Sequence, residues 1–510
     1  MYGRFSSGSN FFRHSETGVA NAANTTFGYR IDQSVSTIKL SALARDLGGS
    51  LEFPIGCDES DLDIKEVSHS SLDVPVGGLF AAITGKVNDG HDFAAEAVKN
   101  GAAALLVERP VNVRAPQILV KDVASVLGVA ASRIFGDPSD KLKIIGVTGT
   151  SGKTTVVQYL KQMLDYFGFK SVSLGTLEGR RTTPEAPDLQ RWLARQVEAA
   201  VDVVCMEVSS HGLELGRVNG VTFDLGIFLN LSPEHLDFHS DMESYFSAKK
   251  QLFDGRSTTA LVNLENDWGR RLESELSPSM PTISFSLKDF SDVNSDFNGL
   301  KFRWRGFEVA TRMVGRFNLE NLAAAAVAAS QIGLSDAEIA ESMEGLVQVP
   351  GRMQLVSHDE SDISVIVDYA HKPEALEAAL RAISGIADGR IWAVFGAGGD
   401  RDKGKRPLMG KIASELADFV IITSDNPRFE NPEVIAEEIT GNIEEFAVEL
   451  DRDTAIGSAI SKAKPGDAVL IAGKGHEKVQ IFGSSELPFD DVAIAQKNLY
   501  LRKAAKGKRS

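Results

Sequence analysis

The feature that most constrains how this chain folds is a glycine-rich loop, Gly146-Val-Thr-Gly-Thr-Ser-Gly-Lys-Thr-Thr155. The β-branched run 141–145 before the loop predicts a buried strand, and residues 156–167 after it have helical spacing. Glycine lets the backbone wrap around an anion, and the free N–H groups at a helix start point toward that anion. We therefore predict a phosphate-binding loop in which Lys153 reaches the β- and γ-phosphates of a nucleotide and Thr154 binds Mg²⁺.

Composition narrows the class of protein. The chain has 510 residues, a length that suggests about three domains. It contains no apolar run long enough to span a membrane and no apolar signal core, and its two cysteines, Cys57 and Cys205, lie far apart. The net charge of −16 argues against general nucleic-acid binding. We expect a monomeric cytoplasmic protein with small-molecule ligands, no nucleic-acid partner and no transmembrane segment.

The order of expected elements predicts an α/β fold with three domains behind a leader. Residues 1–37 are rich in Ser, Asn, Gly and Thr without periodicity, so we expect them to be disordered. Residues 38–114 predict a small α/β domain, and residues 115–349 a central P-loop ATPase-like domain with a parallel sheet. Residues 350–510 predict a C-terminal Rossmann-like domain that is doubly wound.

The C-terminal region has the clearest alternation of strands and helices. Apolar strands are expected at 363–367, 391–395, 419–423 and 468–472, and helices at 373–383, 406–416 and 432–446. In such sheets ligands bind beyond the carboxyl ends of the strands. Polar loops follow all four strands, at 368–371, 396–406, 425–428 and 473–477. The pattern therefore predicts a ligand-binding rim.

The central region places ionisable side chains after expected strands. Glu207 follows the strand 200–206, and His235 follows the strand 223–230. A carboxylate at a strand end near a phosphate loop is suited to Mg²⁺, a hard cation that prefers oxygen ligands. Lys249 lies on an expected helix, where a lysine is usually a solvated surface residue.

The glycine loop resembles that of the Mur ligases and of the related folylpolyglutamate synthetases, which are ATP-dependent enzymes that join an amino acid to a carboxylate. The pattern is Gly-x-x-Gly-Thr-x-Gly-Lys-Thr, with Val147 where the common phosphate loop has glycine. Met206-Glu-Val-Ser-Ser-His-Gly-Leu213 and Asp425-Asn-Pro-Arg428 are similar to the tripeptide-forming, diaminopimelate-adding branch of the Mur ligases. The resemblance covers about residues 38–498.

This resemblance implies an ATP site and a metal site. The implied ATP-binding residues are Gly149, Thr150, Ser151, Gly152, Lys153, Thr154, Thr155, Asn318, Arg352 and Asp368. Asn318 has an alternative interpretation as a helix cap. The implied Mg²⁺ ligands are Thr154, Glu207, His235 and a CO₂-derived carbamate on Lys249. A carbamate forms only on a neutral amine, so the site would have to lower the pKa of that lysine.

The resemblance also implies two substrate sites. The UDP-muramoyl peptide would bind Ser70, Thr182, Thr183, Gln190, Ser209 and Arg217. At the family's Asp-Ser-Arg motif this chain has His69-Ser70-Ser71, so the arginine contact is missing. The diaminopimelate site would contain Arg401, Asp425, Asn426, Pro427, Arg428, Gly473 and Glu477.

Physical chemistry supports the assignment of Arg428 to an amino acid with a distal carboxylate. A guanidinium holds a carboxylate through two parallel hydrogen bonds. Lysine lacks that carboxylate and would leave the arginine unpaired, which disfavours lysine. Glu477 would hold the distal ammonium group. The alternative is that Arg428 forms a structural ion pair.

Two other functions stay open at this point. A folylpolyglutamate synthetase would share the phosphate loop but lacks the extra N-terminal domain and the Glu207–Gly212 pattern. A catalytically silent nucleotide-binding regulator would have lost the loop lysine or a metal ligand, and this sequence keeps them. The basic tail 502–509 is expected to be a solvated end or a contact with an anionic membrane or a partner.

Overall fold

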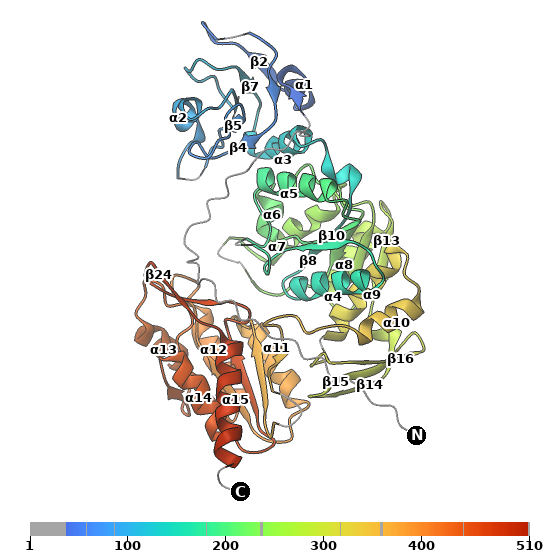
Figure 1. Ribbon diagram of the computed structural model, residues 1–510, viewed down its shortest axis with the longest axis vertical. Helices are drawn as coiled ribbons and strands as arrows, with labels where there is room; N and C mark the ends of the chain where they lie inside the picture. The colour runs from blue at the N-terminus through green and yellow to red at the C-terminus, as the bar shows by residue number, and fades with distance from the viewer. Residues whose placement is uncertain are drawn as a thin grey trace, which may run out of the picture.

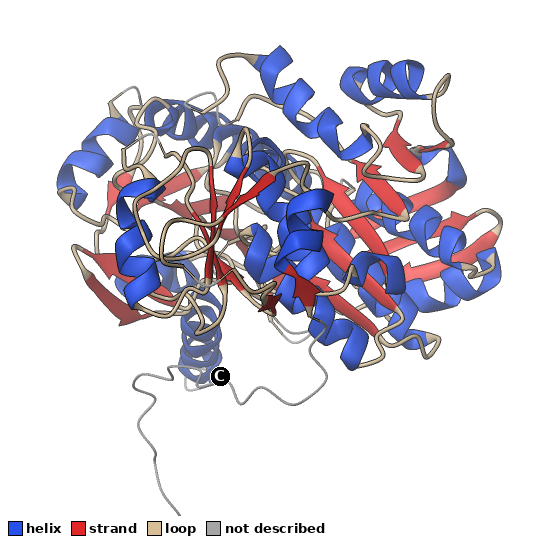
Figure 2. Cartoon of the chain, turned by 90° about the horizontal axis from the view of Figure 1, so that it is seen from above, coloured by secondary structure: helices blue, strands red, loops and turns tan. Residues whose placement is uncertain are grey.

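The computed structural model describes residues 37–57, 59–85, 87–179, 181–234, 238–316, 318–357, 361–441 and 443–507. The expected leader therefore lies almost wholly outside the described residues. Figure 1 shows three α/β parts in chain order, the first at the top, the second in the middle and the third at the lower left. Helices lie on both sides of the strands (Figure 2). No helix among the described residues is long and apolar enough to cross a bilayer.

The first part is built on a five-stranded sheet. Its strands, in spatial order, are β2 (Ser50–Glu52), β7 (Gln117–Leu119), β6 (Ala104–Val107), β5 (Leu79–Ala81) and β4 (Val67–Ser68). A small second sheet pairs β1 (Ile38–Lys39) with β3 (Asp63–Ile64), and the helices are α1 (Leu40–Asp46), α2 (Ala94–Lys99) and α3 (Val123–Ile134). The expected boundary at residue 114 is wrong, because β7 pairs with β6 and the apolar face of α3 packs on the same core.

The second part contains the phosphate loop in a six-stranded parallel sheet. Its strands, in spatial order, are β13 (Thr282–Phe285), β12 (Ala260–Asn263), β11 (Leu225–Phe228), β8 (Lys143–Thr148), β10 (Val203–Glu207) and β9 (Ser171–Leu174). Alternate strand residues enter two different cores: Ile145 and Cys205 on one face, and Ile144 and Val204 on the other. Since both faces are buried, the central strands β8, β10, β11 and β12 are largely apolar, as parallel strands usually are, whereas the edge strands β9 and β13 alternate polar and apolar residues.

Helices cover both faces of this sheet. They are α4 (Lys153–Tyr166), α5 (Ala186–Glu198), α6 (Ser210–Glu214), α7 (Met242–Lys250), α8 (Asp267–Leu276), α9 (Asn318–Ile332) and α10 (Asp336–Glu344). An antiparallel sheet of β14 (Phe290–Asp296), β15 (Gly299–Trp304) and β16 (Phe307–Thr311) extends the core under α9 and α10. The alanines of α9 let it pack closely on α4, the helix that starts at the phosphate loop.

The third part confirms the expected doubly wound domain. Its sheet has the order β17 (Gln354–Leu355), β18 (Ser364–Asp368), β22 (Ala468–Ala472), β19 (Ile391–Phe395), β20 (Phe419–Ile422) and β21 (Ala447–Val448). Only β17 runs antiparallel to its neighbour among these described strands. The helices are α11 (Pro373–Ser384), α12 (Lys405–Leu416), α13 (Pro432–Thr440), α14 (Arg452–Lys462) and α15 (Asp491–Gly507), and β23 (Val479–Phe482) and β24 (Ser485–Pro488) form a hairpin.

Candidate active site

The phosphate loop lies between β8 and α4, as predicted, in the centre of the second sheet. Gly152 has φ +87°, and a Cβ there would lie 2.5 Å from Asn321 Oδ1, so this position requires glycine. Asn230, just after β11, holds the loop from the side. Its carbonyl oxygen accepts from Thr150 N at 3.1 Å, and its Oδ1 accepts from Ser151 N at 2.9 Å. The loop is thus fixed with its backbone N–H groups at the start of α4 available to an anion.

Two lysines converge on one carbonyl oxygen of this loop. Lys153 Nζ donates to Gly149 O at 2.7 Å and to Thr150 O at 3.1 Å. Lys249 Nζ, from α7, donates to the same Gly149 O at 3.0 Å and lies 4.5 Å from the centre of the Tyr245 ring. Lys249 is buried, whereas its neighbour Lys250 is half exposed and pairs with Glu275. The sequence alone could not distinguish these two lysines by their surroundings.

Burial makes both amines less basic. It lowers the pKa of Lys249 well below its usual range, and the nearby Lys153 lowers it further. Burial also lowers the pKa of Lys153, with Glu207 opposing the shift and Arg352 adding to it. A neutral Lys249 amine is the form that can react with CO₂.

Glu207 is the centre of the predicted metal site. It ends β10 and is buried, and its Oε1 accepts from Thr154 Oγ1 at 2.9 Å and from Thr176 N at 2.8 Å. Gly175 leaves the space for this carboxylate, because a Cβ there would lie 2.2 Å from Glu207 Oε1. The structure therefore brings Thr154 and Glu207 together. His235 lies outside the described residues, and the described residues contain no cluster of three His, Cys, Asp or Glu suited to a metal.

Arg352 connects the second and third parts at this site. Its Nη2 donates to Thr154 Oγ1 at 3.2 Å, and its guanidinium lies 4.4 Å from the centre of the Tyr369 ring. Asp368, at the end of β18, accepts from Met353 N at 2.6 Å and from Ala370 N at 2.8 Å. Burial raises the pKa of Asp368. Arg352 and Asp368 thus lie where the hinge meets the third part.

Asn318 and Thr155 occupy interior positions. Asn318 begins α9, and its Nδ2 donates to Val314 O at 2.7 Å, which ties the helix start to the preceding loop. Its Oδ1 accepts from Asn321 Nδ2 at 3.2 Å, and Asn321 approaches Gly152. This arrangement connects Asn318 to the phosphate loop through one residue. Thr155 is buried in the first turn of α4.

Most of the residues predicted to bind the UDP-muramoyl peptide lie beside Glu207. Thr183 Oγ1 donates to Glu207 O at 3.1 Å, and Thr183 Oγ1 accepts from Ser209 N at 3.0 Å. Arg217 Nη1 donates to Thr183 O at 3.3 Å, and its Nη2 pairs with Glu185 at 2.9 Å. Thr182 Oγ1 lies 3.2 Å from Thr176 Oγ1.

Two members of this predicted set lie apart from that cluster. Gln190 is fully buried on α5, and its Nε2 donates to Gly220 O at 3.0 Å. Ser70 belongs to the first part, and its Oγ lies 3.4 Å from Asp73 Oδ2. Burial lowers the pKa of its neighbour His69; Asp188 of the second part opposes this shift, and Arg181 and Arg217 of the second part add to it, so this loop faces the second part.

The predicted diaminopimelate residues come together on the rim of the third sheet. Arg428 Nη1 donates to Gly399 O at 2.7 Å, and Arg401 lies along the same glycine loop, beside Gly398. Asn426 Nδ2 donates to Glu477 Oε2 at 2.8 Å. A Cβ on Gly473, where φ is +117°, would lie 2.5 Å from Asp425 Oδ2. Pro427 follows in the same turn, and its carbonyl oxygen packs against Gly399.

Two fully buried arginines support this rim from below. Arg452 Nε and Nη2 donate to the two carboxylate oxygens of Asp491 at 2.7 and 2.8 Å, and Nη2 also donates to Ala472 O at 2.9 Å. Arg406 pairs with Glu430 and Glu438 and donates to Gly398 O at 3.1 Å. These ion pairs and their hydrogen bonds to backbone carbonyl groups hold the strand ends in one arrangement.

Sequence reasoning missed several residues of the site. Thr176 donates to both Glu207 oxygens, Lys372 pairs with Glu234 across the two parts, and Lys474 lies beneath the rim. Thr176 follows β9, next to β10, so strand order would have revealed it. Lys372 and Lys474 depend on contacts between distant loops, so the sequence could place Lys474 in the polar loop 473–477 but could not show its partners.

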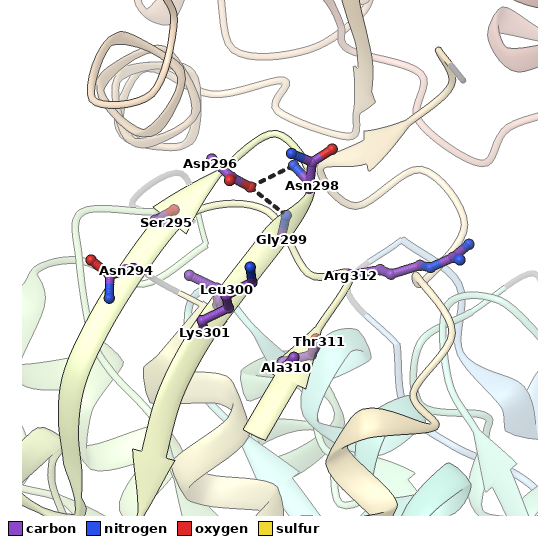
Figure 3. Close-up of a pocket in the computed structure, with 10 residues that line it drawn as sticks. All are labelled: Asn294, Ser295, Asp296, Asn298, Gly299, Leu300, Lys301, Ala310, Thr311 and Arg312. Carbon is purple, nitrogen blue, oxygen red and sulfur yellow. Dashed lines mark hydrogen bonds between the residues drawn. The ribbon is translucent and has the colours of Figure 1, made fainter. Parts of the chain in front are cut away.

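A separate cavity of about 490 Å³ lies away from these residues, on the sheet of β14, β15 and β16 (Figure 3). Its lining includes Asn294, Asp296, Lys301 and Arg312. Asp296 Oδ1 closes the hairpin by accepting from Asn298 N at 2.7 Å and from Gly299 N at 3.1 Å. The lining contains none of the predicted site residues, so the candidate active site remains the region around the phosphate loop and the rim.

Comparison with known protein families gives matches along most of the chain. Residues 63–142 match the Mur ligase family, catalytic domain; residues 147–329 match the Mur ligase middle domain; and residues 351–475 match the Mur ligase, glutamate ligase domain. The three matches follow the three parts of the structure in order.

Individual relatives cover nearly the whole chain. A protein of Clostridium acetobutylicum named UDP-N-acetylmuramoyl-L-alanyl-D-glutamate--2,6-diaminopimelate ligase 1 is 37% identical, over 88% of this chain and 97% of its own length. A Gloeobacter violaceus protein, also named as a UDP-N-acetylmuramoyl-L-alanyl-D-glutamate--2,6-diaminopimelate ligase, is 41% identical over 87% of this chain and 95% of its own length.

Solved structures of Mur ligases also resemble this chain along most of its length. A structure named as a UDP-N-acetylmuramoyl-L-alanyl-D-glutamate--2,6-diaminopimelate ligase has a TM-score of 0.67, 31% identity, and covers 92% of this chain and 100% of its own. A Thermotoga maritima MurF ligase in complex with ADP has a TM-score of 0.59 at 21% identity and covers 88% of this chain and 99% of its own, which supports the fold.

Proposed function

Because the chain belongs to the Mur ligase family, we propose that it is an ATP-dependent ligase that joins meso-2,6-diaminopimelate to UDP-N-acetylmuramoyl-L-alanyl-D-glutamate in peptidoglycan synthesis. The observation that carries this proposal is the junction at Arg352, which contacts Thr154 of the phosphate loop and Tyr369 beside the rim. The phosphate loop can therefore activate a carboxylate while the rim of the third part delivers an amine. We place the reaction in the cytoplasm and propose that the enzyme acts as a monomer.

The chemistry follows from the poor electrophilicity of a carboxylate. ATP would phosphorylate the side-chain carboxylate of the D-glutamyl residue, giving an acyl phosphate and ADP. The amine of diaminopimelate then attacks the acyl carbon, a C–N bond forms, and phosphate leaves. The Lys153 ammonium group and the N–H groups at the start of α4 would stabilise the negative charge on the transferring phosphoryl group.

The residues around Glu207 suit Mg²⁺. Thr154 supplies a hydroxyl oxygen and Glu207 a carboxylate in direct contact at 2.9 Å, and hard cations prefer such donors. We propose that His235 and a carbamate on Lys249 complete the ligand set. When bound, Mg²⁺ would neutralise charge on the phosphates.

Lys249 suits carbamylation because of its surroundings. It is buried, its pKa is lowered well below the usual range by burial, and it shares Gly149 O with Lys153. If both amines carried a proton, their positive charges would repel each other, which favours the neutral form of Lys249. Conversion of Lys249 to an anion would replace this repulsion with attraction to Lys153.

The substrate residues place the two reacting groups. Thr183 contacts the backbone of Glu207, and Ser209 and Arg217 contact Thr183, so a muramoyl peptide held there would present its glutamyl end to the phosphate loop. Thr182, Gln190 and Ser70 would complete that site. Diaminopimelate would bind the rim, with its distal carboxylate on Arg428 and its distal ammonium group on Glu477.

The test is product identification. Purified protein with ATP, Mg²⁺, UDP-N-acetylmuramoyl-L-alanyl-D-glutamate and meso-diaminopimelate should form a UDP-muramoyl-tripeptide of the expected mass, with one phosphate released per product. Lys153→Ala should form none. ATP hydrolysis stimulated by folate and not by the muramoyl peptide would indicate the folate enzyme. ATP binding without any ligation would indicate the silent regulator.

A further inference from the structure

Lys474 is a fully buried lysine directly beneath the predicted diaminopimelate site. It follows β22, in the loop Gly473–Glu477, and has 0% exposed surface. Its Nζ donates to Asn426 Oδ1 at 3.0 Å and to Glu477 Oε2 at 3.2 Å. Burying an ammonium group is costly unless it is paired and hydrogen-bonded. Both of its partners belong to the predicted amino-acid site.

The first effect of Lys474 is on the side-chain amide of Asn426. Asn426 Oδ1 accepts from Lys474 Nζ and from Ile481 N at 3.0 Å. Because both neighbours are donors, the oxygen must face them, and the amide nitrogen must face Glu477. Asn426 Nδ2 donates to Glu477 Oε2 at 2.8 Å, as this orientation requires.

The second effect is on the carboxylate of Glu477. Oε2 of this carboxylate accepts from both Asn426 and Lys474, so its rotation is fixed from two sides. The side chain remains 31% exposed, and Oε1 is the oxygen left for a ligand. Lys474 also pairs its positive charge with the Glu477 carboxylate at 3.2 Å, which holds this carboxylate at the rim.

We infer that Lys474 is a positioning residue for the incoming amino acid. It holds Asn426 and Glu477 in one orientation, so that one carboxylate oxygen of Glu477 faces the distal ammonium group of the ligand. This inference rests on the proposed function for the assignment of the rim to diaminopimelate. It assigns a binding role to a side chain that the ligand does not touch. The loop sequence alone does not distinguish this role from that of a surface lysine.

The test compares amino-acid binding in Lys474→Met and in a matched control variant. In Lys474→Met, the KM for meso-diaminopimelate should rise about 10- to 100-fold, the range for losing a hydrogen bond to a charged group, while the KM for ATP stays unchanged. Lys478→Met is the matched control: Lys478 lies directly after the same loop but is exposed and pairs with Asp490 at 2.6 Å. This control should keep both KM values.

A double-mutant cycle separates positioning from a merely structural role. If Lys474 acts through Glu477, then Lys474→Met combined with Glu477→Gln should bind no worse than the weaker single variant. Multiplication of the two single effects, or an unchanged KM in Lys474→Met, would overturn the inference. If Lys474→Met fails to fold, Lys474→Gln, which keeps an N–H donor but loses the charge, should still raise the same KM, and an unchanged KM in this variant would overturn the inference.

Calorimetric titration with meso-diaminopimelate distinguishes this inference from the proposed function. Binding to the wild type without ligation would defeat the proposed function, and the variants could still be compared by their Kd. If the wild type ligates or binds a different amino acid, such as L-lysine, the cycle is run with that amino acid. Absence of any amino-acid binding to the wild type would overturn the inference.

Discussion

At the scale of single residues, the two lysines on Gly149 O are the feature with the largest chemical consequence. Sequence spacing placed Lys249 on a helix, and a family resemblance suggested the carbamate, but neither showed what surrounds the amine. The structure supplies the burial, the Tyr245 ring and the shared carbonyl oxygen. Burial by elements distant in sequence cannot be read from a local pattern.

The carbamate predicts a rescue experiment on Lys249. Lys249→Ala should lower ATP-dependent ligation by about 100-fold or more, because an anion beside the phosphate loop is lost. Added short carboxylic acids should restore part of the rate by occupying the vacated space. Phosphate release at increasing acetate concentration measures this.

Lys250→Ala is the control, since Lys250 pairs with Glu275 at the surface. It should keep full activity and show no response to acetate. Unchanged activity in Lys249→Ala would rule out the carbamate.

His371 predicts a pH dependence of stability. Burial lowers its pKa to about 4, from an ordinary value near 6.5, and the nearby Lys405 contributes to the shift. Between these two values the unfolded chain binds the proton and the folded chain does not, so the free energy of unfolding falls as the pH drops. Through His371 alone, acidification from pH 7 to pH 5 should lower the free energy of unfolding by about 2 kcal/mol.

The measurement is urea unfolding of the wild type and His371→Asn at both pH values. The loss of stability on acidification should be about 2 kcal/mol smaller in the variant. Equal losses in the two proteins would show that His371 is not held neutral in the folded state.

At the scale of elements, α4 lies between two glycines that have different functions. Gly152 precedes it with φ +87° and lies close to Asn321, and Gly168 follows it with φ +82° in open space. The sequence indicated both glycines as helix boundaries. It did not reveal that Asn321 of α9, more than 150 residues later in the chain, lies close to Gly152.

The two glycines predict different effects on nucleotide binding. Each Gly→Ala change should cost about 1 kcal/mol of stability, because φ is positive at both positions. Only Gly152→Ala should also weaken ATP binding, because its methyl group would displace Asn321 or the loop. We expect the affinity for ATP to fall 10-fold or more, which corresponds to about 1.4 kcal/mol. Calorimetric titration with ATP and thermal melting of both variants would check this, and equal ATP affinity in the two would contradict it.

Strands and helices with strong periodicity were predictable, including the four main strands of the third sheet. The sequence-based account missed the sheet of β14, β15 and β16, whose polar exposed faces weaken the signal for a strand. It also extended the helix at 432–446 six residues beyond the end of α13 at Thr440.

The first residue of the basic tail, Arg502, is not part of a freely solvated end. Arg502 on α15 pairs with Asp362 at 2.7 Å and donates to Ile460 O at 2.7 Å, which anchors the helix.

At the scale of the whole molecule, the order of the parts was predictable and their junctions were not. The first boundary was placed too early because β7 returns to the first sheet after a loop. Arg191 Nη2 pairs with Glu66 at 2.9 Å between the first and second parts, and Arg352 connects the second and third. Such contacts depend on three-dimensional arrangement, so single-sequence reasoning identified the residue types but not their partners.

The central claim is that the phosphate loop and the Arg428 rim form one ligase site selective for an amino acid with a distal carboxylate. The most direct test measures phosphate release with ATP, Mg²⁺ and UDP-N-acetylmuramoyl-L-alanyl-D-glutamate, adding meso-diaminopimelate or L-lysine separately. The account predicts a kcat/KM for diaminopimelate about 100-fold or more above that for lysine, a preference that Arg428→Ala should largely remove. An equal or higher kcat/KM for lysine in the wild type would contradict it.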